Sequence, residues 1–149
     1  MAEPGPDLSS TVLPETAQAV ESGRRFAQAA LNAGGYRGRH EDILLIVSEL
    51  VTNVLRHGSG APRLSVLCSA DGARVRVEVA DDSPIAPAPR PSGPHGGFGL
   101  MVVGRLGEWG TIPRGAGKVV WCEVETADVT DGAGLPTGRA PDPELAVSP

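Results

Sequence analysis

The chain has few aromatic residues, few cysteines and no long apolar run, and each shortage excludes a class of protein. Aromatic residues make up 3% of the 149 residues, and the two cysteines, Cys68 and Cys122, stand alone without CxxC spacing. This usage predicts reduced thiols in a cytoplasmic protein rather than a disulfide framework or a zinc site. No apolar run approaches the roughly 20 residues that a membrane span needs, so no membrane partner is expected.

An excess of basic charge is also lacking. Lys and Arg number 13 against 18 Asp and Glu, which gives a formal net charge of −5. Nucleic-acid binders neutralise phosphates with basic patches, so direct binding of DNA or RNA is not expected. At this length one domain is the default, and its partner is expected to be a small molecule or a protein.

Glycine and proline, in contrast, are abundant, and their distribution predicts the limits of the domain. The chain has 20 Gly and 14 Pro. Residues 1 to 14 and 126 to 149 combine Pro, Gly, Ser and Asp without a hydrophobic period, which is typical of mobile ends. The folded domain is therefore predicted over residues 15 to 125. The C-terminal end carries −3 of the net charge, so the remainder is close to neutral.

Hydrophobic periodicity predicts three helices, at residues 15 to 31, 39 to 57 and 99 to 106. Alternation with a period of two predicts strands at residues 63 to 70 and 74 to 80, joined by a turn at Asp71-Gly72, and two further strands at residues 109 to 112 and 119 to 124. Strands grouped as hairpins predict an α+β fold, a two-layer sandwich with helices on one face of a mostly antiparallel sheet.

Three polar residues share one stripe of the helix at residues 39 to 57. Glu49, Asn53 and His57 are spaced four apart and fall within an arc of about 80° beside the apolar face. A solvated helix face produces the same pattern, so the stripe alone leaves both interpretations open.

Two further features are equally open when each is taken alone. Asp81 ends a predicted strand, where an Asx turn is the ordinary reason for an aspartate. Glycines at residues 96 to 99 precede a predicted helix, where they form either a simple turn or a loop whose backbone N–H groups approach a phosphate. Neither a Walker loop nor a GxGxxG fingerprint is present.

In combination, these features resemble a known ATP-binding fold. The motifs are SELVTNVLRH at residues 48 to 57, VEVADDSP at 77 to 84 and GGFGLMVV at 96 to 103. Their order is similar to that of the Bergerat-type (histidine kinase-like) ATPase domains. Within that superfamily the chain looks most like the anti-sigma factor serine/threonine kinases and their short actinobacterial relatives.

The resemblance implies ATP and Mg²⁺ as cofactors and gives roles to particular residues. Asn53 would offer its side-chain oxygen to Mg²⁺, which prefers hard oxygen ligands. Asp81 would accept a hydrogen bond from the adenine amino group. Residues 82 to 97 would form a lid over the nucleotide. Three residues would hold the phosphates through their backbone amides: Gly97, Gly99 and Leu100.

The resemblance also implies a reaction and its partners. Glu49 would act as general base for a serine hydroxyl on an anti-anti-sigma (STAS-type) protein, and a sigma factor is the other implied partner. Relatives are often homodimers. The alternative is a non-catalytic adaptor that keeps the pocket as a switch. It is favoured by a first glycine motif that lacks its glycines, and by Val119 at the expected place of a threonine near adenine.

Overall fold

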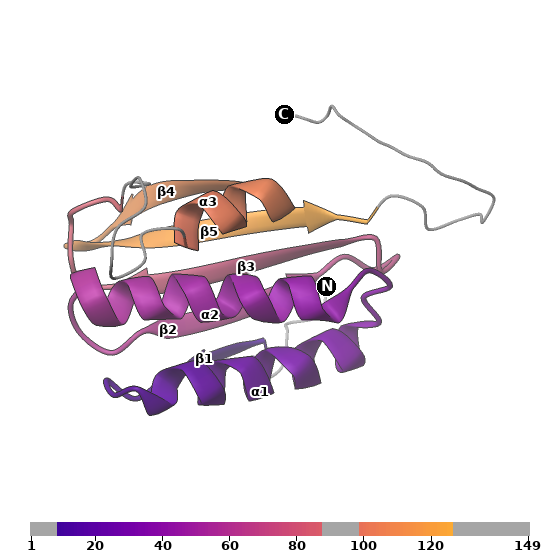
Figure 1. Cartoon of the computed structure of the whole chain (residues 1–149), viewed down its shortest axis with the longest axis horizontal. Helices are drawn as coiled ribbons and strands as arrows, with labels where there is room; N and C mark the ends of the chain where they lie inside the picture. Colours follow the sequence, from indigo (N-terminus) through magenta and orange to yellow (C-terminus); the bar gives the residue numbers. More distant parts are fainter. Residues whose placement is uncertain (1–8, 88–98, 127–149) are drawn as a thin grey trace.

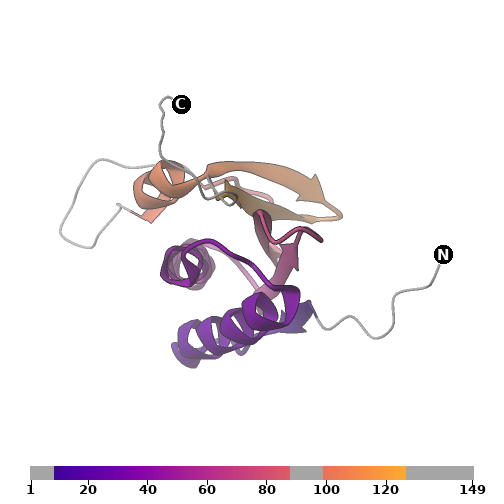
Figure 2. The same cartoon turned by 90° about the vertical axis from the view of Figure 1, so that its right-hand side faces the viewer.

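The computed structural model describes residues 9 to 87 and 99 to 126, which form one sheet and three helices. The strand order is β1-β2-β3-β5-β4, and every neighbouring pair is antiparallel. The helices all lie on one face of the sheet (Figures 1 and 2). The predicted α+β sandwich is thereby confirmed. In chain order the elements are β1 (Ser10–Val12), α1 (Gln18–Gly34), α2 (His40–His57), β2 (Arg63–Cys68), β3 (Arg74–Asp81), α3 (Gly99–Leu106), β4 (Glu108–Arg114) and β5 (Gly117–Glu125).

The core lies between the sheet and the helices, and it follows from alternation along the strands. Val75, Val77 and Val79 of β3 all face the helices and are at most 1% exposed. The central helix α2 supplies the opposing surface, because its apolar residues recur every three or four positions. The fully buried members on α2 are Ile43, Ile46, Val47, Leu50 and Val51.

The turns form where the sequence predicts them. The β2–β3 hairpin turns at Gly72, whose φ of 74° favours glycine, and the Asp71 carboxylate accepts the N–H of Ala73 at 2.9 Å. Helix α1 ends at Gly34, three residues beyond the predicted end, and Gly35 follows it in the left-handed conformation. These local signals explain why the predicted α2, α3, β2 and β3 agree with the structure to within two residues at each end.

The prediction of a mobile arm over residues 1 to 14 is wrong where it covers β1. Ser10–Val12 pairs with β2, Leu13 is 3% exposed, and its N–H donates to the carbonyl of Pro62 at 2.8 Å. A three-residue edge strand is too short to show a period of two, so tertiary pairing decides its conformation. Residues 1 to 8 lie outside the described part of the chain.

Two other predicted segments lie largely beyond the described residues. The structure describes residues 82 to 87 of the predicted lid and gives them no helix or strand. It does not describe residues 88 to 98 or the predicted tail beyond residue 126. Among the residues it does describe, none of the helices is long and apolar enough to cross a membrane.

Alkaline pH is expected to destabilise the core through Cys122. Burial, with smaller effects from the charges of Glu123 and Glu108, raises the pKa of this thiol from 9.0 to about 12. The folded state therefore holds the proton after the unfolded chain has lost it. The stability that this gives is complete below pH 9 and is lost as the pH rises toward 12, at about 1.4 kcal/mol per pH unit.

Urea unfolding in reductant at pH 8 and pH 11 measures this loss. The Cys122→Ala variant is expected to lose less unfolding free energy between the two pH values than the wild type. Part of the loss remains in the variant, because burial also raises the pKa of Tyr36 to about 12. An identical loss in both proteins would show that the thiol does not contribute.

Candidate functional site

The polar stripe predicted on α2 lies at the boundary of the core. Glu49 and Asn53 are half-buried, whereas His57, one turn further, is exposed at the end of the helix. The apolar residues in the same turns of α2 pack into the core. This packing fixes the positions of Glu49 and Asn53 beside them. This pattern agrees with Glu49 and Asn53 lining a site and with His57 lying in solvent.

Glu49 lies against the start of α3. A Cβ built on Gly99 would lie 2.6 Å from Oε1 of Glu49, so the carboxylate occupies the space beside the first residue of that helix. The structure thus brings together two of the predicted site residues that are 50 positions apart. The N-terminal backbone N–H groups of a helix lack partners within the helix and favour negative groups.

Leu100 and Gly97 differ from Gly99. Leu100 is 5% exposed, and its side chain belongs to the core between α3 and the sheet. Any contact with a ligand must therefore come from its backbone. Gly97 lies outside the described residues.

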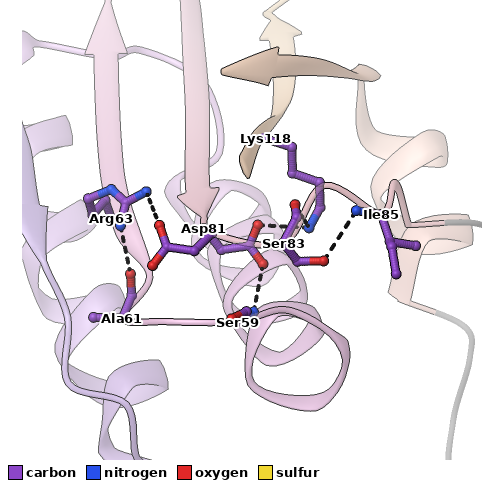
Figure 3. A network of polar contacts seen from close by, with 8 residues as sticks. Ser59, Ala61, Arg63, Asp81, Ser83, Ile85 and Lys118 are labelled. Atoms are coloured by element: carbon purple, nitrogen blue, oxygen red, sulfur yellow. Dashed lines mark hydrogen bonds and ion pairs between the residues drawn. The ribbon is translucent and has the colours of Figure 1, made fainter. Parts of the chain in front are cut away.

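Asp81 is the most buried polar residue of the site. It ends β3, is 1% exposed, and has both carboxylate oxygens engaged (Figure 3). Oδ2 accepts the backbone N–H of Ser59 at 3.1 Å, and Oδ1 accepts Nζ of Lys118 at 2.7 Å. A Cβ on Gly58 would collide with Oδ2, so the glycine that follows α2 allows its last turn to approach the carboxylate.

The sequence reasoning missed Lys118. This residue pairs with Asp81 in the β3–β5 register and is 6% exposed, and its ammonium also donates to the carbonyl of Ser83 at 3.3 Å. Strand β5 begins at Gly117, two residues before the predicted strand at residues 119 to 124, and that prediction does not include Lys118. The signal was available, because a strand that begins at residue 117 puts Lys118 on the same face as Val120 and Cys122.

The sequence predicts that Val119 stands at the place of a threonine near adenine, and this prediction is wrong for the same reason. Val119 pairs with Ala80, and together with Arg63 and Ser10 these residues line a groove of about 320 Å³ on the face away from the helices. Successive residues of a strand point to opposite faces. The residue of β5 that faces Asp81 is therefore Lys118.

The segment after Asp81 is held without glycines. The N–H of Asp82 donates to the carbonyl of Ser59 at 2.8 Å, and the Ser83 hydroxyl accepts the N–H of Ile85 at 3.2 Å. The Asp82 side chain is exposed and pairs with Arg63 at 3.2 Å. The Asp-x-Ser-Pro form of this motif thus makes a serine turn in place of the flexible glycines.

These groups are suited to a magnesium nucleotide. The Asn53 amide, one helical turn from the Glu49 carboxylate, offers a hard oxygen atom of the kind that Mg²⁺ takes together with phosphates. Within the described residues, no three His, Cys, Asp or Glu side chains form a metal site of their own. A magnesium ion here would therefore depend on oxygen atoms from the ligand as well as from Asn53.

Comparison with known proteins gives the family. The family model of the histidine kinase-like ATPase domain matches residues 13 to 122, most of the chain. The chain therefore belongs to the histidine kinase-like ATPase domain family. No curated protein gives a significant sequence match.

A solved structure shares this fold. The RsbU and RsbW domains of Rv1364c from Mycobacterium tuberculosis superpose with a TM-score of 0.54 at 20% identity, over 78% of this chain and 31% of that one. This chain thus corresponds to about a third of that structure. The histidine kinase domain of the Escherichia coli osmosensor EnvZ gives a TM-score of 0.46 at 16% identity, over 92% of this chain and 100% of that one.

Proposed function

We propose that this chain is a cytoplasmic ATP-binding anti-sigma regulatory factor that phosphorylates an anti-anti-sigma antagonist on serine. The observation that carries the proposal is the position of Glu49, half-buried on α2 with its carboxylate against Gly99 at the start of α3. A general base must lie within reach of the proton it accepts, and phosphoryl transfer depends mainly on positioning and charge neutralisation. A carboxylate beside a candidate phosphate-binding helix start meets the requirement of reach, and charge neutralisation is left to Mg²⁺ and the N–H groups of the helix start.

The neighbouring residues take complementary roles in this proposal. Asn53 would hold Mg²⁺ through its amide oxygen, and the backbone N–H groups at Gly99 and Leu100 would hold phosphate oxygens. When bound, Mg²⁺ neutralises charge on the phosphates. Glu49 would orient the serine hydroxyl and accept its proton. Buried Asp81 would accept a hydrogen bond from the amino group of adenine.

The partner is proposed from resemblance and fold together. The motifs on α2 and β3 resemble those of anti-sigma factor kinases, and one structure that shares the fold contains a domain named RsbW. An anti-anti-sigma protein of the STAS type is therefore the proposed substrate. A sigma factor is the proposed second partner, and a homodimer is the proposed assembly.

A non-catalytic adaptor is the second candidate, and Asp81 favours it. Both oxygens of this carboxylate already have protein partners, so a base must share them with Ser59 and Lys118. The two functions separate in one experiment with the full chain, γ-labelled ATP, Mg²⁺ and a co-encoded anti-anti-sigma protein. Label on a serine of the partner supports the kinase, whereas ATP binding without transfer leaves the adaptor. The absence of ATP binding at millimolar nucleotide contradicts both.

Replacing Gly99 by alanine is expected to reduce this transfer without loss of stability. The new Cβ would displace the flexible end of Glu49, which costs little because that end can turn aside. Transfer rates and urea unfolding of the same preparation measure the two effects.

Gly104→Ala is the matched control on the same helix. A Cβ there would meet Trp109 at 3.5 Å, an ordinary contact, so transfer should be unchanged. Equal transfer rates in both variants would show that the position of the Glu49 carboxylate does not matter.

A further inference from the structure

Lysine occurs once in the chain, and that lysine is buried in the site. Apart from three histidines, the other basic residues are 12 arginines. Lys118 is 6% exposed, on the helix-facing side of β5. Lysine is almost never buried unless it is paired.

The ion pair with Asp81 is not explained well by stability alone. Removing two charges from water is costly, and apolar residues of similar volume often serve folding as well or better. The pair also lies beside the end of α2, on the side of the sheet that this helix covers (Figures 1 and 3). A charged pair that is costly to bury and lies beside the candidate site is a candidate for contact with a ligand.

The pair has hydrogen-bonding capacity left. Within the described residues, the ammonium of Lys118 uses two of its three protons, on Asp81 and on the Ser83 carbonyl. The Asp81 carboxylate uses two of about four lone-pair sites, on Lys118 and Ser59. Within this part of the chain, one donor and at least one acceptor therefore remain, on groups that are 2.7 Å apart.

We propose that Lys118 reads the nucleotide base together with Asp81, by donating a hydrogen bond to ring nitrogen N1 of adenine. This inference rests on the proposed function, because it requires ATP in the site. The edge of adenine presents a 6-amino donor beside the N1 acceptor. An acceptor on Asp81 beside a donor on Lys118 is the complement of that edge.

The same pair disfavours bases in which the hydrogen-bond donor and acceptor at positions 6 and 1 are exchanged. Hypoxanthine and guanine present a carbonyl oxygen at position 6 and an N–H at position 1. In the same orientation, the oxygen would face the Asp81 carboxylate and the N–H would face the Lys118 ammonium. Lys118 thus adds a second unfavourable contact against ITP and GTP beyond that of Asp81.

Three nucleotides test the proposal on the unaltered full chain. Calorimetric titration measures the dissociation constants of ATP, of 1-deaza-ATP, which keeps the amino group but has C–H in place of N1, and of ITP. A lost hydrogen bond to a charged donor is expected to weaken 1-deaza-ATP by about tenfold or more relative to ATP. ITP is expected to bind still more weakly.

The single lysine gives a second, independent measurement. In protein labelled with ¹⁵N or ¹³C in lysine, the only side-chain signal belongs to Lys118. Saturating ATP is expected to shift this signal, and 1-deaza-ATP to shift it much less. A Lys118→Met variant, if it folds without the partner of Asp81, is expected to bind ATP and 1-deaza-ATP equally well.

The outcomes separate this inference from the proposed function. Binding of 1-deaza-ATP within about threefold of ATP would overturn it and leave Lys118 as a structural partner of Asp81. The absence of saturable ATP binding would overturn it as well. A penalty for 1-deaza-ATP without any phosphoryl transfer would support base reading by Lys118 and contradict the kinase.

Discussion

Replacing Glu49 by glutamine is expected to reduce phosphoryl transfer about 100-fold or more while ATP affinity stays within about threefold of the wild type. Glutamine keeps the size of the side chain beside Gly99 but cannot accept a proton from a hydroxyl. Binding depends on other groups, namely Asn53, Asp81 and the start of α3. Single-turnover transfer to the anti-anti-sigma substrate and calorimetric titration with ATP measure the two quantities separately.

Glu41→Gln is the matched control on the same helix. Glu41 is exposed in the first turn of α2 and pairs with the exposed Arg39, at 3.4 Å. Its replacement should change neither quantity, because exposed ion pairs contribute little. Transfer that survives in Glu49→Gln would contradict the role of Glu49 as base and return the chain to the adaptor alternative.

The Asp81→Ala variant is expected to lose about 3–5 kcal/mol of unfolding free energy. The change leaves the Lys118 ammonium buried without its carboxylate and removes the acceptor of the Ser59 N–H. Urea unfolding at neutral pH measures the loss. Adding Lys118→Met in the same chain should restore part of it, since no unpaired charge then remains.

The neighbouring aspartate gives the control. Asp82 is exposed and pairs with exposed Arg63, so Asp82→Ala is expected to cost at most about 1 kcal/mol. The two variants remove the same group from adjacent positions and differ in burial. Equal costs would contradict the description of Asp81 and Lys118 as a buried pair, in which removal of one partner leaves the other charge buried alone.

The sequence predicts the helices and the long strands because their signals are local. These signals each span only a few residues and agree with the structure: the alternating valines in β3, the polar stripe on α2 and the turn at Gly72. Strand β1 has no such signal, since its three residues acquire their conformation only by pairing with β2.

The candidate site likewise has a part that local patterns predict and a part that depends on packing. The spacing of Glu49 and Asn53 follows from helix geometry, so their common face was predictable. The approach of Glu49 to Gly99 and of Lys118 to Asp81 depends on how α3 and β5 pack, which no local pattern contains. The starting residue of β5 also decides whether Lys118 or Val119 faces the site, because a shift of one residue reverses every side chain.

Calorimetric titration of the full chain with ATP and Mg²⁺ tests the central claim, that α2, β3 and α3 form a nucleotide site. Saturable binding is expected, with affinity about tenfold or more weaker in Asn53→Ala. Asn32→Ala, on exposed α1 surface, should bind as the wild type does. No saturable binding at millimolar ATP, or equal affinity in Asn53→Ala and Asn32→Ala, would contradict the site.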